Sequence, residues 1–438
     1  MKEKEAENPG LGDHVDPKNK LKVRELVHKL IISQLFYDGF QQVASQMIQL
    51  THPDSPCPPS DRLVHLVTLG LEQEQKTQGA KITSISTKFD HLGAGLDLES
   101  MNEAAIQAPE PCLYETVYVT AHKAPCRAGA INSDGSLVAT GSADTSIKIL
   151  SVERMLAKSS DVESTEPQGH PVIRTLYDHG EEVTSLEFHP KEQILVSGSR
   201  DCTVRLFDYS RTSVKKAFRV INESAQVQSL SFHPTGDYLI VGTKQPVLRV
   251  YDVNTSQCFV SNHLDGCHKG EIMSLAWSSD GKMYVSASVD GSIKIWDGVS
   301  SKCINTIAKA HDGTEVGSVT FTRNNKYILS SGKDSLVKLW ELSTYRSLIA
   351  YTGAGATGKQ EFTSQACFNH TEEYAIYPDE ATVSLCVWDA RTAQRQNLLS
   401  LGHNGPIRRI VHSAVSAGFL TCSDDFRARF WYRRMVPL

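Results

Sequence analysis

A histidine, an aspartate and a large apolar residue recur along this chain at nearly fixed intervals. The aspartate follows the histidine by 22 or 23 residues, and the apolar residue follows the aspartate by six. Repetition with a period of about 40 to 50 residues indicates an architecture built from similar units. The five complete copies are His122, Asp144 and Leu150; His179, Asp201 and Phe207; His268, Asp290 and Trp296; His311, Asp334 and Trp340; and His403, Asp425 and Trp431.

Two further copies are degenerate. They span residues 226–252 and 365–389, with Gln245 and Thr382 at the position of the aspartate. Successive units are 43 to 48 residues apart, except for a first step of 57 that contains an insertion from residue 151 to about residue 173. The sequence therefore predicts seven units.

Each unit has the pattern of short antiparallel strands. In residues 274–297, apolar positions surround the turn sequences SDG and VDG, which favour positive φ and close hairpins. Four strands per unit with a Trp-Asp ending are typical of a β-propeller blade. Over residues 114–434 the chain resembles the WD-repeat family. We expect a mainly β fold, a seven-bladed WD-repeat propeller, with a small N-terminal helical dimerisation domain.

The resemblance implies a structural role for the recurring residues. In WD-repeat blades, the histidine, the aspartate, a strand hydroxyl and the tryptophan form a buried hydrogen-bonded chain, which His268, Ser286, Asp290 and Trp296 match here. Removing one member leaves its partners unpaired, which costs about 1–3 kcal/mol. Seven copies suit a structural element better than a catalytic pair.

Closure of the ring is also predicted. The last unit ends in a strand at residues 428–432, and six residues remain after it, too few for an outer strand. Residues 114–122 are strand-like and directly precede the first histidine. We expect them to pair beside residues 428–432 and to cover the open edge.

Composition excludes several classes of protein. Of the 438 residues, 40% are hydrophobic and 22% are charged, as in ordinary globular chains. The net charge of −5 comes from residues 1–110, so the remainder lacks the basic footprint of a stand-alone nucleic-acid binder. The ten cysteines form no CxxC pair, and we expect no disulfide framework, metal or cofactor. With no long apolar run and a polar N-terminus, we expect no membrane association.

The N-terminal region changes to a helical period. Apolar stripes over residues 23–35 and 40–48 flank Asp38 and Gly39, and Ser60 is placed to cap a third helix. Such helices are too small for their own core, so they either pack on the propeller or pair with a second copy, as do the dimerisation modules of many WD-repeat proteins. We expect a disordered tail at 1–20, the dimerisation domain at 21–75, a linker at 76–112 and the propeller at 113–438. The dimerisation residues are Leu26, Leu30, Ile31, Leu35, Phe36, Leu63 and Leu66.

Residues 352–360, TGAGATGKQ, resemble a phosphate-binding loop. Gln360 stands where a Ser or Thr would bind magnesium, and strand-like residues 362–368 follow in place of the required helix. We expect an inter-blade loop rather than a nucleotide site.

Basic residues cluster near the turns at one end of the predicted blades. They suit an acidic or carboxylate-bearing peptide over the central channel, although a solvated rim is the simpler interpretation. The candidate partner-binding residues are Arg200, Lys244, Lys333, Arg408, Arg409, Arg427 and Arg429.

Several segments support a closer resemblance. Residues 29–40, 174–179, 188–201, 330–341, 351–359 and 421–434 are similar to the WD-repeat subunits of cleavage stimulation factor. The resemblance implies a nuclear, non-enzymatic scaffold in pre-mRNA 3′-end cleavage and polyadenylation. It also implies a homodimer that docks the helical-repeat scaffold subunit, with an RNA-recognition subunit in the same complex and at most auxiliary RNA contact. The rival hypotheses are a ubiquitin-ligase substrate receptor and a nucleotide-dependent enzyme.

Overall fold

The computed structural model describes residues 17–52, 55–64, 95–98, 113–159, 169–211, 215–261, 266–354, 361–396 and 398–433. The chain divides into two compact units, Met1–Thr87 and Lys88–Leu438. No helix among the described residues is long and apolar enough to cross a membrane.

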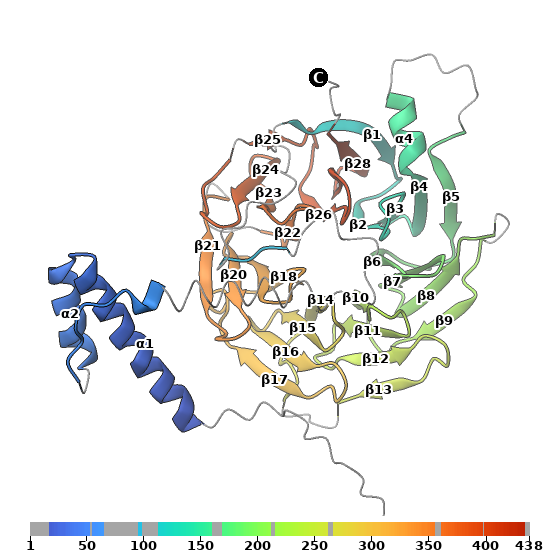
Figure 1. Cartoon of the computed structure of the whole chain (residues 1–438). Coiled ribbons are helices and arrows are strands. Elements are labelled where there is room, and N and C mark those ends of the chain that lie inside the picture. The colour runs from blue at the N-terminus through green and yellow to red at the C-terminus, as the bar shows by residue number, and fades with distance from the viewer. Residues whose placement is uncertain are drawn as a thin grey trace, which may run out of the picture. The chain divides into compact units, whose positions relative to one another are not determined.

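Strands of the second unit form a closed propeller. In the described residues they make seven four-stranded antiparallel sheets, and each sheet runs from an inner strand near the axis (β2, β6, β10, β14, β18, β22 or β26) to an outer strand at the rim (Figure 1). The seven-bladed fold expected from the repeats is therefore confirmed. We number the blades in chain order, so the blade that starts with β2 is the first.

The bounds of the strands follow the repeat. The first three blades are β2 (Cys126–Ile131), β3 (Leu137–Ser142), β4 (Ser146–Ser151) and β5 (Val172–Tyr177); β6 (Val183–Phe188), β7 (Ile194–Ser199), β8 (Thr203–Asp208) and β9 (Arg219–Asn222); and β10 (Val227–Phe232), β11 (Tyr238–Thr243), β12 (Arg249–Asp252) and β13 (Cys258–Val260). The next three are β14 (Ile272–Trp277), β15 (Met283–Ser288), β16 (Ile293–Asp297) and β17 (Cys303–Ile307); β18 (Val316–Phe321), β19 (Tyr327–Gly332), β20 (Val337–Glu341) and β21 (Ser347–Tyr351); and β22 (Cys367–Phe368), β23 (Tyr374–Asp379), β24 (Ser384–Asp389) and β25 (Leu399–Ser400). The seventh blade contains β26 (Ile407–His412), β27 (Gly418–Ser423) and β28 (Arg427–Tyr432).

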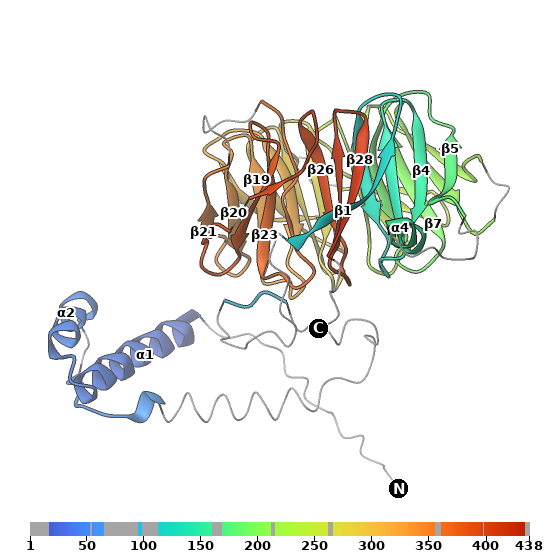
Figure 2. The same ribbon diagram turned by 90° about the horizontal axis from the view of Figure 1, so that it is seen from above.

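The fourth strand of the seventh blade comes from the opposite end of the propeller sequence. β1 (Glu115–Ala121) pairs antiparallel with β28, and the order of this sheet is β1-β28-β27-β26 (Figure 2). Thr120 lies opposite Ala428, and the N–H of His122 donates to the carbonyl of Phe426 at 2.8 Å. The predicted closure by residues 114–122 is thus present in the structure.

The repeating aspartate explains why the chain turns at the same point in five blades. In the fourth blade the Asp290 carboxylate accepts the N–H of Ser292 at 2.9 Å, and Gly291 between them has a φ of 78°. Non-glycine residues take the same left-handed conformation elsewhere, including Phe426 with a φ of 68°. An aspartate that bonds to the backbone two residues later stabilises such a turn.

Neighbouring blades are joined near the axis by serine hydroxyls. Ser229, Ser274 and Ser318 occupy the same position in the inner strands of the third, fourth and fifth blades. Each accepts a backbone N–H from the next blade, at 3.1, 3.2 and 3.0 Å respectively. These bonds satisfy backbone N–H groups on the inner edge of each sheet, where no further strand is present to accept them.

The first unit begins with two helices. α1 (Pro17–Tyr37) and α2 (Gln41–Thr51) are separated at Gly39, which has a φ of 85°. Ile32 and Ala44 are fully buried. α1 begins before residue 21, so residues predicted to belong to the N-terminal tail are helical. Residues 62–64 are also helical, and the Ser60 hydroxyl accepts the N–H of Arg62 at 3.2 Å.

Two segments outside the repeats pack against the propeller. The insertion after β4 starts with a helix, α4 (Val152–Ser159), and its Met155 is buried in a cluster with Leu420 and Phe430 of the seventh blade. Within the predicted linker at 76–112, residues 95–98 pack on the propeller, with Leu96 only 2% exposed. The linker is therefore interrupted by a bound stretch.

Candidate interaction surfaces

The fourth blade shows how the recurring residues meet. Trp296 on β16 donates its indole N–H to the hydroxyl of Ser286 on β15 at 2.8 Å, and this hydroxyl lies 2.6 Å from Nε2 of His268. Nδ1 of His268 lies 3.2 Å from the Asp290 carboxylate. Since the carboxylate can only accept, Nδ1 carries the proton and Nε2 accepts from the serine. The four side chains form one continuous chain of hydrogen bonds.

The other complete copies repeat this geometry. His179 and Asp201 are 2.9 Å apart, His311 and Asp334 are 2.9 Å apart, His403 and Asp425 are 2.9 Å apart, and His122 and Asp144 are 3.5 Å apart. The strand hydroxyls in contact with these histidines belong to Ser197, Ser330, Thr421 and Thr140, and the tryptophans that donate to them are Trp340 and Trp431.

The protonation states and burial of the histidine–aspartate pairs indicate a structural role. Burial lowers the pKa of His122 to about 4 and also lowers the pKa of His268, so both rings are neutral at pH 7. Burial alone would raise the pKa of Asp201, but hydrogen bonds from Thr203, Gly180 and His179 outweigh it and lower this pKa to about 2. The histidine side chains have no exposed surface. A ring that no substrate can touch cannot act as a general base.

The two degenerate blades use other residues for the same purpose. In the third blade Glu223 lies 22 residues before Gln245, at the histidine position, and accepts the hydroxyl of Tyr251 at 2.8 Å. Arg249 joins Glu223 at 3.2 Å and Gln245 at 2.7 Å. In the sixth blade the indole of Trp388 donates to the carbonyl of Thr352 at 2.9 Å. Glu223 was not predicted from the sequence, although the histidine–aspartate spacing points to it.

Ser286 gives a test of the blade network. Ser286→Ala removes the acceptor of the Trp296 N–H and the donor to His268, so we expect a loss of about 2–3 kcal/mol in unfolding free energy. The matched control is Ser197→Ala. Ser197 is equally buried, but Phe207 stands at the tryptophan position, so this substitution leaves only the histidine without its hydrogen-bond partner and should cost less. Chemical denaturation measures both. Equal losses in the two variants would contradict this role of the network.

The predicted basic rim is largely neutralised by acidic neighbours. Arg200 pairs with Glu182 at 3.0 Å, Lys333 with Glu315 at 2.9 Å and Arg408 with Asp424 at 2.5 Å. Arg429 donates to the carbonyl of Gly402, and Arg409 is half-buried on β26, where desolvation lowers its pKa. Of the seven candidates, Lys244 and Arg427 are exposed without an ion pair to another described residue.

Aromatic residues on this face were not identified from the sequence. The ring centroid of Phe362 lies 3.5 Å from the Arg408 guanidinium carbon, and Phe426 is 45% exposed beside Arg427. Arginine and aromatic side chains are enriched where protein partners bind. The face therefore offers mixed arginine and phenylalanine contacts rather than a uniformly basic surface.

The helical unit exposes an apolar stripe. On and beside α2, Phe40, Val43 and Leu50 are exposed at helical spacing, and Leu50 has 82% of its surface free. Among the predicted dimerisation residues, Leu26 is exposed, whereas Leu30, Ile31, Leu35, Phe36 and Leu63 are half-buried and Leu66 lies outside the described residues. Exposed apolar surface of this kind is typical of an association surface.

Residues 352–360 lack the surroundings of a phosphate site. Gly353 has a φ of 95°, and residues 355–360 lie outside the described part of the chain. Residues 361–366 are not helical, and the short strand β22 follows. The described residues that follow the loop therefore supply no helix N-terminus to bind an anion.

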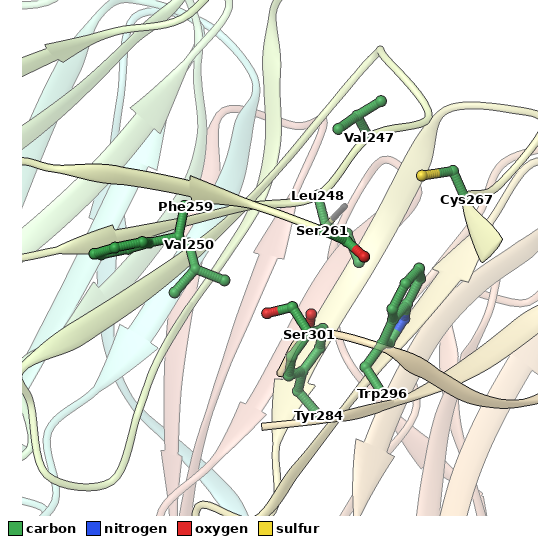
Figure 3. A pocket seen from close by; sticks show the side chains of 9 residues that line it. All are labelled: Val247, Leu248, Val250, Phe259, Ser261, Cys267, Tyr284, Trp296 and Ser301. Atoms are coloured by element: carbon green, nitrogen blue, oxygen red, sulfur yellow. The ribbon is translucent and has the colours of Figure 1, made fainter. Parts of the chain in front are cut away.

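A small pocket lies at the outer side of the junction between the third and fourth blades. Figure 3 shows Phe259, Tyr284 and Trp296 around it, together with Cys267 and Ser301. The described residues that line it include no carboxylate and no histidine. No group of three or more possible metal ligands occurs among the described residues.

Both the N-terminal helices and the propeller are similar to known proteins. The description "Cleavage stimulation factor subunit 1, dimerisation domain" matches residues 19–75, and "WD domain, G-beta repeat" matches residues 112–151 and 171–208. Residues 231–354 match "Vps8 beta-propeller". Cleavage stimulation factor subunit 50 of Arabidopsis thaliana is 39% identical over 414 residues, which cover 92% of this chain and 95% of the relative. This chain belongs to the cleavage stimulation factor subunit 50 family.

More distant relatives match a smaller share of the chain. Nuclear distribution protein nudF of Emericella nidulans is 27% identical over 59% of this chain and 60% of its own length. Serine-threonine kinase receptor-associated protein of Gallus gallus is 27% identical over 31% of this chain and 36% of its own length. In the cleavage stimulation factor subunit 50 family, the WD-repeat propeller is combined with the helical dimerisation domain.

Proposed function

We propose that this chain is a non-enzymatic scaffold subunit of cleavage stimulation factor that acts in pre-mRNA 3′-end cleavage and polyadenylation in the nucleus. It dimerises through its N-terminal helices and docks the helical-repeat scaffold subunit on its propeller. The RNA-recognition subunit belongs to the same complex, and this chain contributes at most auxiliary RNA contact. The observation that carries the proposal is a relationship covering almost the full length of both proteins, helices and propeller included.

The chemistry of the described residues supports binding rather than catalysis. The histidine–aspartate pairs are buried, and the rim cations Arg200, Lys333 and Arg408 are paired with acidic residues. What remains exposed is suited to protein contacts: the apolar stripe of α2 and the phenylalanine–arginine face of the propeller.

A depletion and restoration experiment tests the proposal. Nuclear extract is depleted of this protein, and cleavage of a polyadenylation substrate RNA is measured before and after adding purified chain. We expect depletion to reduce cleavage and both wild type and Lys359→Ala to restore it, since Lys359 belongs to no nucleotide site. Failure of the wild type to restore cleavage would contradict the proposal, and selective failure of Lys359→Ala would favour the nucleotide-dependent enzyme.

A further inference from the structure

Residues 95–98, Gly-Leu-Asp-Leu, lie against the turns at one end of the fifth and sixth blades (Figure 2). The Leu96 side chain belongs to a buried cluster that contains Tyr327 of the fifth blade and Ala390 of the sixth. The segment makes both apolar and polar contacts with the propeller. It has the character of a peptide bound in a site.

Backbone groups of the segment are held by the propeller. The N–H of Leu96 donates to Oε2 of Glu372 at 2.7 Å, while Oε1 of the same carboxylate accepts the N–H of Arg323 at 2.7 Å. The Leu98 N–H donates to the Tyr327 hydroxyl at 3.3 Å. Since the Glu372 residue is only 6% exposed, removing the segment would deprive a buried carboxylate of one of its donors.

Asp97 is held through both its backbone and its side chain. The Arg391 guanidinium donates to its carbonyl at 2.6 Å, and the Lys326 ammonium lies 2.8 Å from its carboxylate. The site therefore favours an acidic residue directly after the buried leucine.

The first position of the segment requires glycine. Gly95 has a φ of 90°, a conformation that side chains disfavour, and an added Cβ would lie 2.5 Å from Oε2 of Glu372 and 3.1 Å from Cβ of Arg323. Glycine is thus selected by both backbone conformation and lack of space.

Two other junctions, between the second and third blades and between the third and fourth, are closed by a histidine. His189 donates its Nε2–H to the Gly236 carbonyl of the next blade at 3.1 Å, and His233 lies 3.3 Å from the Gly281 carbonyl in the same way. In the fifth blade the corresponding residue is Thr322, whose hydroxyl bonds within its own turn to Asn324 at 2.7 Å. The sixth blade has Glu372, at a φ of 61°, at the position of Gly236 in the third blade and Gly281 in the fourth. Here no histidine spans the junction, and Leu96 contacts both sides.

We propose that the junction of the fifth and sixth blades is a peptide-binding site for a Gly-Leu-acidic-Leu sequence, occupied by residues 95–98 of the same chain. Its occupation anchors the connection, so that residues 76–94 of the predicted linker separate the dimerisation domain from the first residue held by the propeller. Binding of the segment thereby limits the distance between each propeller and the dimerisation domain.

Hydrogen exchange in the full-length dimer provides the test. We expect the amides of Leu96 and Leu98 to exchange at least tenfold faster in Leu96→Asp than in the wild type, because the buried leucine holds the segment. Gly95→Val should have the same effect through steric exclusion and serves as an independent variant. The control is Leu113→Asp, which adds the same charge at a leucine that is 46% exposed and should leave the exchange of residues 95–98 unchanged.

A peptide distinguishes a vacated site from a damaged one. A fluorescent peptide with the sequence of residues 91–100 should bind the Leu96→Asp chain at least tenfold more tightly than the wild type, whose site is filled. Equal exchange rates in Leu96→Asp and the wild type, or no preference of the peptide for the variant, would overturn the proposal. The same exchange experiment is done on a dissociated dimer whose residues 95–98 are unchanged. Loss of protection of residues 95–98 in that sample would contradict binding within one chain and would show that the segment comes from a second copy.

Discussion

Proline at Val119 and Thr120 in β1 is expected to open the propeller ring. Consecutive backbone N–H groups of a strand point to opposite sides, so one of these two N–H groups faces β28. Because proline has no N–H, replacing both residues removes that hydrogen bond. A lost ladder bond and an unpaired buried carbonyl cost about 1–3 kcal/mol each, and the exposed β28 edge favours aggregation. We expect the unfolding free energy, measured by chemical denaturation, to fall by at least about 2 kcal/mol.

The control keeps the backbone donors and removes the side chains. The double variant Val119→Ala, Thr120→Ala retains both N–H groups and should lose less stability than the proline variant, although Thr120 is buried. A proline variant as stable as the wild type would show that the ring does not depend on the pairing of β1 with β28.

Aspartate at Val43 and Leu50 of α2 is expected to convert the dimer to a monomer. The two residues are seven positions apart on one helical face, and both are exposed within a single chain. Burying four carboxylates at a two-fold interface without partners is strongly unfavourable. We expect the dissociation constant to rise by at least ~100-fold, an effect of about 3 kcal/mol, as measured by sedimentation equilibrium.

Val299→Asp provides the matched control for added charge. Val299 lies in the propeller and is 93% exposed, so this variant should remain a dimer. A Val43→Asp, Leu50→Asp chain that still sediments as a dimer would place the dimer interface elsewhere on the helices.

Repetition made the propeller predictable from the sequence. The spacing from His268 to Asp290 and Trp296, repeated in other units, predicted the number of blades, and the strand-like residues 114–122 predicted which segment pairs beside residues 428–432. β1 confirms this pairing. Period and turn chemistry are local properties, so they can be recognised without knowledge of the fold.

Contacts between separate strands and segments could not be predicted from the sequence. The pairing of Arg200 with Glu182, and of Arg408 with Asp424, neutralises cations that look available in isolation. Leu96 lies in a stretch with the composition of a linker, and its burial depends on Glu372, which is 276 residues away in the chain. A single sequence carries no signal for such a contact, because each partner is ordinary in its own segment.

Affinity capture of the full-length chain from nuclear extract, followed by quantitative mass spectrometry, tests most directly whether this protein is a dimeric assembly subunit. We expect the wild type to capture a second copy of itself together with the other subunits of cleavage stimulation factor. The Val43→Asp, Leu50→Asp variant should lose the second copy and retain the helical-repeat scaffold subunit. Recovery of a cullin ubiquitin ligase without cleavage stimulation factor subunits would contradict the proposed function.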